Sequence, residues 1–330
     1  MMLARNAESL FWIGRYVERA DDTARILDVG VHQLLEDATV DADQQARGLL
    51  RILGITPPDG EELNVWSMTE LVAFNRESGD SIADALYRAR ENARGAREVT
   101  STEMWECLNT TFNGIADSEK LARKLGPHEF FSYVENRSAL FSGLVDSTLS
   151  RDDGYLFLLL GKHIERIDMI IRLLLVGSGD RSDASWVSVL RAAGAHDTYL
   201  RTYRGVLNST SVVEFLVLDR LFPRSVFYSL HRAEECLAEL DRGDLYSRVG
   251  SQNEARRIIG GARSDLEYTR ASDLVDDLYA RLSRVQAACL ETGEAVAERY
   301  FTVEPYMLWS DVRAIGRPGA DLEPETGAAR

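Results

Sequence analysis

The sequence predicts an all-α protein, a multi-helix bundle formed by two tandem-duplicated halves. Apolar residues recur with the helical period over long segments, no long segment alternates with the period of two that is typical of a strand, and one motif occurs twice. The longest periodic segment spans 4–37. Its apolar positions are Leu10, Ile13, Val17, Ala20, Ala24, Leu27, Val31 and Leu34. Steps of three and four residues place them on one face of an amphipathic helix.

Further helices are expected along both halves. In the first half they span 42–53, 69–75, 81–98, a segment that starts at 101, and 127–149. In the second half they span 152–176, 184–204, 211–219, 223–240, 252–268 and 273–300. Glycine and proline are frequent in 316–330, which we expect to form a disordered tail.

Two collinear matches within the chain indicate a duplication. Segment 14–27 aligns without a gap to 161–174, with identical glycine, glutamate, arginine, aspartate, second arginine and leucine. Segment 71–91 likewise aligns to 215–235, and Ser81 aligns with Ser225. Repeats of this size usually pack about a pseudo-twofold axis. We therefore expect an N-terminal half, 1–150, and a C-terminal half, 151–315, within one continuous helical domain.

The charge of the chain argues against two classes of partner. Its 53 acidic and 38 basic residues give a net charge of −15. Nucleic-acid binding needs clustered positive charge, and anionic membrane surfaces repel an acidic protein. The first residues lack the pattern of a signal peptide, and charges interrupt the most apolar segment, 155–176. We expect a cytoplasmic protein that binds neither nucleic acid nor membrane.

The cysteines predict no disulfide framework and no zinc site. They are Cys107, Cys236 and Cys289, an odd number without a Cys-x-x-Cys pair. We expect buried thiols in a reducing compartment.

The duplicated motif places a polar stripe beside the apolar one on each helix. Its members are Gly14, Glu18, Asp21 and Arg25 in the first helix, and Gly161, Glu165, Asp168 and Arg172 in the second. Glycine inside a helix costs about 0.5–1 kcal/mol relative to alanine. Its presence in both copies predicts the close approach of another backbone or of a ligand.

Two interpretations of this stripe remain open. In the structural one, Asp21–Arg25 and Asp168–Arg172 form i,i+4 ion pairs, and the glutamates pair with arginines of the other repeat motif. In the functional one, the stripes form a polar cleft for a peptide, amide or phosphate-bearing ligand. The candidate residues for either are Arg15, Glu18, Asp21, Arg25, Arg76, Arg88, Glu165, Arg166, Asp168, Arg172, Arg220 and Arg232.

Specific chemistries find little support. A ferritin-like dimetal site uses Glu-x-x-His, whereas both repeats carry Glu-x-x-Asp with an arginine one turn later. We therefore expect no metal and no cofactor. The histidines are scattered, although His163 and His231 lie inside repeat motifs, and the spacing of His231 and Cys236 does not align them on one helix face. Neither a phosphate-binding glycine loop nor a Gly-x-Ser-x-Gly elbow is present.

Three segments carry a family resemblance. Met2-Leu-Ala-Arg-Asn-Ala, Gly14-Arg-Tyr-Val-Glu-Arg-Ala-Asp and Phe222-Pro-Arg-Ser-Val together resemble the bacterial alpha-E family, over 2–300. The resemblance implies an all-helical fold and a genomic setting beside a circularly permuted ATP-grasp peptide-ligase-like protein and a transglutaminase-like cysteine protease. It therefore implies a part in peptide synthesis or protein modification, with those two proteins as partners.

Two functions follow as hypotheses. The first is a non-catalytic accessory or scaffold component of that system. The second is an enzyme acting on a peptide or amide, in which Glu18 and Glu165 act as acid and base and the arginines hold a carboxylate or phosphate. The absence of a recognised nucleophile, metal set or cofactor loop favours the first.

Overall fold

The computed structural model describes residues 2–36, 41–57, 60–177, 183–241 and 253–302. These residues are helical and contain no strand, so the predicted all-α class is confirmed. The predicted tail at 316–330 lies outside the described residues. None of the described helices is long and apolar enough to cross a membrane.

Short connections join the helices of the first half. They are α1 (Ala4–Glu36), α2 (Ala42–Leu53), α3 (Val65–Thr69), the π-helical turn η1 (Glu70–Phe74), the 3-10 turn η2 (Arg76–Ser78), α4 (Ile82–Gly95), α5 (Thr102–Asn113), α6 (Ile115–Leu125) and α7 (His128–Thr148). Helix α6 was not predicted. It begins directly after Gly114 without a side-chain cap, so the usual start signal is missing.

The second half contains α8 (Asp153–Gly177), α9 (Asp183–Ala192), α10 (His196–Thr202), α11 (Ser209–Leu218), α12 (Val226–Leu240), α13 (Glu254–Glu267), α14 (Ala271–Asp276), α15 (Leu278–Val296) and the π-helical turn η4 (Ala297–Phe301). Two predicted helices are each divided. The segment 184–204 breaks at Gly194, whose φ of 62° is left-handed, and 273–300 breaks at Asp277.

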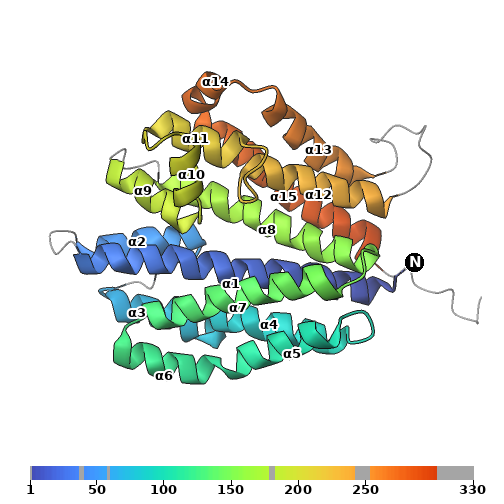
Figure 1. Ribbon diagram of the computed structural model, residues 1–330, viewed down its shortest axis with the longest axis horizontal. Coiled ribbons are helices and arrows are strands. Elements are labelled where there is room, and N and C mark those ends of the chain that lie inside the picture. Colours follow the sequence, from blue (N-terminus) through green and yellow to red (C-terminus); the bar gives the residue numbers. More distant parts are fainter. Residues whose placement is uncertain (1, 37–40, 58–59, 178–182, 242–252, 303–330) are drawn as a thin grey trace, which may run out of the picture.

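Helices α1 and α8 lie side by side through the middle of the molecule and form its largest helix–helix contact (Figure 1). Helices α4 and α7 pack on α1, while α12 and α15 pack on α8. The short helices cross between these groups, because α2 contacts α8 and α9 contacts α1. The two helices that carry the repeated motif therefore pack against each other.

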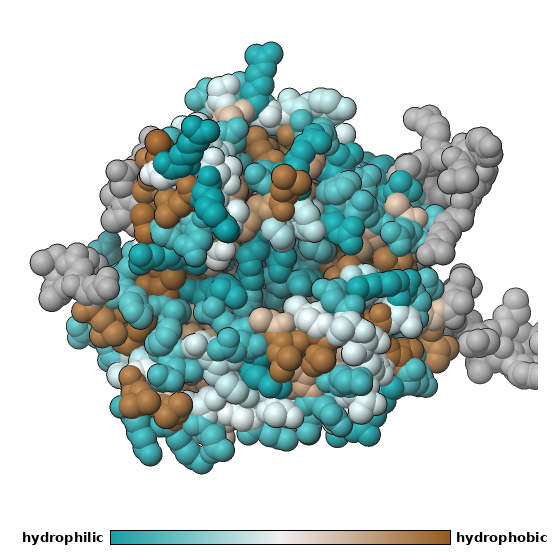
Figure 2. All heavy atoms as spheres, viewed as in Figure 1, coloured by the Kyte–Doolittle hydropathy of each residue, from teal (hydrophilic) through white to brown (hydrophobic). Residues whose placement is uncertain are grey.

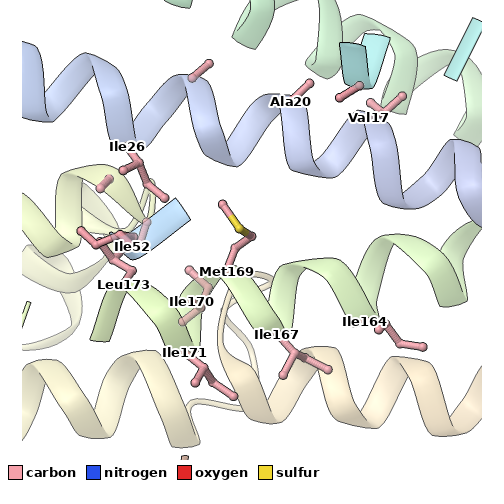
Figure 3. Packing of buried hydrophobic residues seen from close by; sticks show 14 of the residues in the cluster. Val17, Ala20, Ile26, Ile52, Ile164, Ile167, Met169, Ile170, Ile171 and Leu173 are labelled. Carbon is pink, nitrogen blue, oxygen red and sulfur yellow. The ribbon is translucent and has the colours of Figure 1, made fainter. Parts of the chain in front are cut away.

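The core explains the composition of these helices. The apolar stripe of α1 is buried from Leu10 to Val31, whereas Leu34 is only partly buried. Helix α8 is apolar on nearly every side because it touches α1, α2, α12 and α15. Figure 3 shows its isoleucines and Met169 facing these neighbours.

Candidate functional site

The motif helices approach each other most closely at their glycines. A β-carbon on Gly14 would lie 2.0 Å from the carbonyl oxygen of Leu158, and one on Gly161 would lie 2.0 Å from that of Phe11. Neither backbone can move without separating the helices, so any side chain at these positions would disrupt the contact. The predicted close approach of another backbone is confirmed. Helices α1 and α8 run parallel, because Leu10 lies beside Gly154 near the start of both helices and Arg19 binds Glu165 further along both.

One turn beyond the glycines, Glu165 binds two arginines of α1. Arg15 Nε donates to Glu165 Oε2 at 2.7 Å, and Arg19 Nε donates to Oε1 at 2.6 Å. The glutamate side chain is 1% exposed, while those of the arginines are 16% and 29% exposed. We call these three residues, together with Asp168 and Arg172, the Glu165 cluster.

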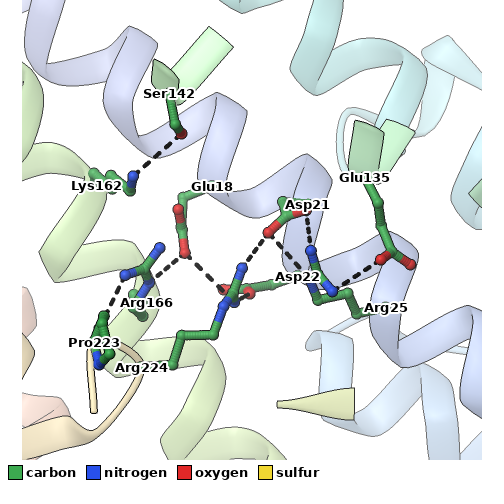
Figure 4. Close-up of polar contacts among 10 residues, drawn as sticks. All are labelled: Glu18, Asp21, Asp22, Arg25, Glu135, Ser142, Lys162, Arg166, Pro223 and Arg224. Carbon is green, nitrogen blue, oxygen red and sulfur yellow. Dashed lines mark hydrogen bonds and ion pairs between the residues drawn. The ribbon is translucent and has the colours of Figure 1, made fainter. Parts of the chain in front are cut away.

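On the other side of the helix pair, Glu18 binds an arginine of α8. Arg166 Nε donates to Glu18 Oε1 at 2.5 Å, and its Nη1 donates to the carbonyl of Pro223 at 3.0 Å. The following residue, Arg224, reaches between the carboxylates of Asp21 and Asp22 and pairs with both (Figure 4). We call Glu18, Asp21, Asp22, Arg166 and Arg224 the Glu18 cluster.

The electrostatics hold both motif glutamates in the charged form. Burial alone would raise the pKa of Glu18, but the charges of Arg166, Arg224 and Lys162 outweigh it and lower the pKa to about 2. Burial would likewise raise the pKa of Glu165, and Arg15 and Arg19 outweigh it and lower the pKa. Neither carboxylate is suited to exchange protons near neutral pH.

Burial shifts the pKa of three other groups, one in the Glu18 cluster and two next to it on α8. Burial raises the pKa of Asp22 to about 7, against the attraction of Arg224, and its Oδ2 has no hydrogen-bond partner among the described residues. Burial lowers the pKa of Lys162, whose Nζ donates to Ser142 Oγ at 3.2 Å. Burial also lowers the pKa of His163 well below its usual range, so this ring is neutral.

The predicted i,i+4 pairs are confirmed. Arg25 Nε lies 3.2 Å from Asp21 Oδ2, and Arg172 Nε lies 2.8 Å from Asp168 Oδ2. Each pair also contacts a further helix. Arg25 Nη1 is 2.8 Å from a carboxylate oxygen of Glu135 on α7, whereas Gln286 Nε2 of α15 donates to Asp168 at 2.7 Å.

The prediction that a glutamate pairs with an arginine of the second repeat motif holds only for Arg224, whose Nη1 lies 3.7 Å from Glu18 Oε1, and it is wrong for the four named arginines. Arg76 lies over the ring of Tyr87, Arg88 pairs with Asp84, Arg220 with Glu267 and Arg232 with Glu235. These arginines belong to outer segments, whereas the motif arginines Arg19 and Arg166 already lie at the contact between α1 and α8. Arg19 and Arg166 pair with the glutamates because they lie closer to them.

Three residues that complete the clusters, Arg19, Asp22 and Arg224, were not among the candidates. Arg19 occupies the same place in the first motif as Arg166 in the second, and the alignment of the repeats was the signal for it. Arg224 lies in a loop far along the chain from Glu18. It lies in the second repeat segment, 215–235, and inside the Phe-Pro-Arg-Ser segment that carries the family resemblance, and these two positions were the signals for it.

Two groups of side chains could in principle hold a metal ion among the described residues. The first, Glu18 with Asp21 and Asp22, already encloses the guanidinium of Arg224. The second, Asp28, His32 and His128, lies beside a surface hollow and was not considered from the sequence, although Asp28 and His32 have i,i+4 spacing. His128 Nδ1 and Asp28 Oδ1 are already 2.7 Å apart, in a hydrogen bond.

The cysteines offer no nucleophile. All three are buried and free, as the sequence predicted. Burial raises the pKa of Cys107 and Cys289, and raises that of Cys236 to about 12. A buried thiol with a raised pKa is an inert structural residue.

The fold and the site together define an all-helical protein whose central helix pair is joined by buried Glu–Arg ion pairs. The chain belongs to the alpha-E family, described as a predicted alpha-helical domain with a conserved ER motif, whose family model matches residues 2–301.

Similar curated proteins include uncharacterized proteins of Mycobacterium bovis and Mycobacterium tuberculosis. Each is 24% identical over 330 aligned positions, which cover 89% of this chain and 36% of the relative. The chain thus spans about a third of the length of these relatives. No solved structure matches the chain.

Proposed function

We propose that this chain is a non-catalytic helical scaffold component of a peptide-synthesis or protein-modification system. Its partners in this proposal are the ATP-grasp ligase and the transglutaminase-like protease that the family resemblance implies. The observation that carries the non-catalytic role is the pairing of both buried motif glutamates with arginines, which lowers the pKa of each glutamate. Groups held in this way stabilise a framework and do not transfer protons.

We further infer that the chain arose by duplication and that its halves are related by a pseudo-twofold axis. Two reciprocal ion pairs between the motif helices support this inference. Arg19 binds Glu165 and Arg166 binds Glu18, although each arginine is the direct neighbour of the other glutamate. The ER motif of the family description then corresponds to these two Glu-Arg dipeptides, and its role is to join the halves 1–150 and 151–315.

The experiment reconstitutes the chain with the two partner proteins and measures both complex formation and product formation. Glu18→Gln and Glu165→Gln are compared with Glu106→Gln, which changes an exposed glutamate of α5. A scaffold predicts that activity follows the fraction of folded chain in every variant.

A different result supports the enzymatic alternative. If folded Glu18→Gln or Glu165→Gln forms the complex and makes no product, the glutamates act as acid or base and the scaffold proposal is wrong. If the chain neither binds the two partners nor changes their rate, the proposed partnership is wrong.

A further inference from the structure

The two clusters are built from corresponding residues of the two motif helices. Glu18, Asp21 and Arg25 correspond to Glu165, Asp168 and Arg172 in the aligned motifs. A short helix ends beside each of the two arginines in a left-handed glycine. Gly54 ends α2 with a φ of 74°, and a β-carbon there would lie 2.0 Å from Arg172 Nη1; Gly194 follows α9 with a φ of 62°, and its β-carbon would lie 3.7 Å from Arg25 Nη1.

The two clusters differ in the residue that precedes the next helix of each repeat. Arg224 directly precedes the N-cap Ser225 of α12, and its guanidinium occupies the Glu18 cluster (Figure 4). The residue that directly precedes the N-cap Ser81 of α4 is Asp80. Asp22 of the Glu18 cluster likewise corresponds to Met169. The Glu165 cluster therefore lacks the arginine that fills its counterpart.

A polar cavity of about 150 Å³ lies in this position. Charged side chains of Arg19, Asp80, Glu165, Asp168 and Arg172 line it, and Leu53 and Met169 add apolar surface. Such a volume holds several water molecules, and therefore also a ligand the size of alanine or serine. The lining residues define this cavity. Separately, the face of the molecule seen in Figure 1 is hydrophilic and hollowed across its middle, with apolar patches above and below (Figure 2).

The lining can hold a negative group on one side. Arg19 and Arg172 each bind a partner carboxylate through Nε, and their Nη atoms make no hydrogen bond within the described part of the chain. Their side chains are 29% and 33% exposed, so these donors are accessible from the cavity. Paired guanidinium groups favour a carboxylate.

The lining can hold a positive group as well. Asp80 is exposed and contributes to the same cavity. With Arg15 included, three arginines balance the three carboxylates of Asp80, Glu165 and Asp168. A phosphate or a divalent cation would upset this balance, whereas a zwitterion preserves it.

We propose that this cavity binds a small amino-acid zwitterion. The carboxylate of the ligand accepts from the Nη groups of Arg19 and Arg172, its ammonium donates to Asp80, and Leu53 and Met169 contact its alkyl part. In the Glu165 cluster the ligand occupies the position that corresponds to that of Arg224 in the Glu18 cluster. This site is independent of the scaffold role.

The first test needs no variant. Isothermal titration of the whole chain compares L-alanine with L-alanine amide, which lacks the carboxylate, and with N-acetyl-L-alanine, which lacks the ammonium. Saturable binding of one L-alanine per chain is expected, with affinity at least about tenfold weaker for either analogue, because each loses charge-assisted hydrogen bonds. No saturable binding of L-alanine at millimolar concentration, or equal binding of all three probes, would overturn the proposal.

The second test places in the cavity the arginine that the Glu18 cluster has at the corresponding position. Asp80→Arg introduces the residue found before Ser225, and it is expected to abolish L-alanine binding while the chain stays folded. The control is Asp197→Arg, the same charge change at an exposed site on α10, which should bind as the native chain does. Arg172→Gln gives an independent check and should weaken binding by about tenfold or more. Unchanged L-alanine affinity in folded Asp80→Arg or Arg172→Gln would place the binding elsewhere and refute the assigned site.

Discussion

Replacing Glu165 with glutamine tests whether the motif glutamates hold the helix pair together. The side chain is 1% exposed and accepts one hydrogen bond on each oxygen, from Arg15 and from Arg19. Glutamine preserves the shape, but its carbonyl can accept from only one arginine, and its amide group faces the other with donor against donor.

The magnitude follows from these contacts. One charge-assisted hydrogen bond is worth about 1.5–3 kcal/mol, and breaking a buried ion pair costs about 3–5 kcal/mol. Both arginine side chains are partly exposed, so solvent screens part of the uncompensated charge. We expect Glu165→Gln to lower the free energy of unfolding by about 2–4 kcal/mol, or the melting temperature by roughly 3–6 °C.

The assay is urea unfolding at neutral pH, followed by helical circular dichroism, with Glu106→Gln as the exposed control. A variant in which Arg15, Arg19 and Glu165 are all leucine should lose less stability than Glu165→Gln, because no charge remains buried without a partner. If Glu165→Gln is as stable as the native chain or more so, the ion pairs do not stabilise the fold and the structural interpretation fails.

Three further predictions follow from the same contacts. Gly14→Ala should destabilise the protein by about 3 kcal/mol, because its β-carbon would meet a backbone carbonyl of α8; Gly143→Ala, with nothing within 4 Å, should be neutral or stabilising in the same unfolding assay. The pKa of Asp22 is raised from 3.8 to about 7, so its contribution to stability is greatest below pH 3.8 and is lost as the pH rises through about 7. Asp22→Asn should therefore raise the melting temperature more at about pH 8 than at about pH 4. A gain confined to low pH would contradict this. The hydrogen bond to Asp28 raises the pKa of His128 above 6.5, so the stabilisation that charged His128 gives is present below pH 6.5 and is lost as the pH rises through the raised pKa. His128→Gln should lower the melting temperature at about pH 6 and have little effect at about pH 9. An equal loss at both pH values would show that the charge is not involved.

Helical periodicity and the repeated motif were sufficient to predict much of this protein. The steps of three and four residues from Leu10 to Val31 predicted α1 and its buried face, because an amphipathic helix carries its packing information locally. Gly14 and Gly161 predicted a close backbone contact, because no other residue accepts so short a distance. The pairs Asp21–Arg25 and Asp168–Arg172 also follow from helix geometry alone.

The tertiary structure decided the partners of the glutamates and the difference between the two clusters. Glu18 could reach any arginine that the fold brought near it, and only the parallel packing of α1 on α8 selects Arg166 over Arg232. The loop before α12 then places Arg224 among three carboxylates, while the corresponding loop before α4 places Asp80 beside an open cavity. Periodicity fixes which face of a helix a side chain occupies, but contacts between residues distant in sequence depend on how the helices pack, and that is a property of the whole chain.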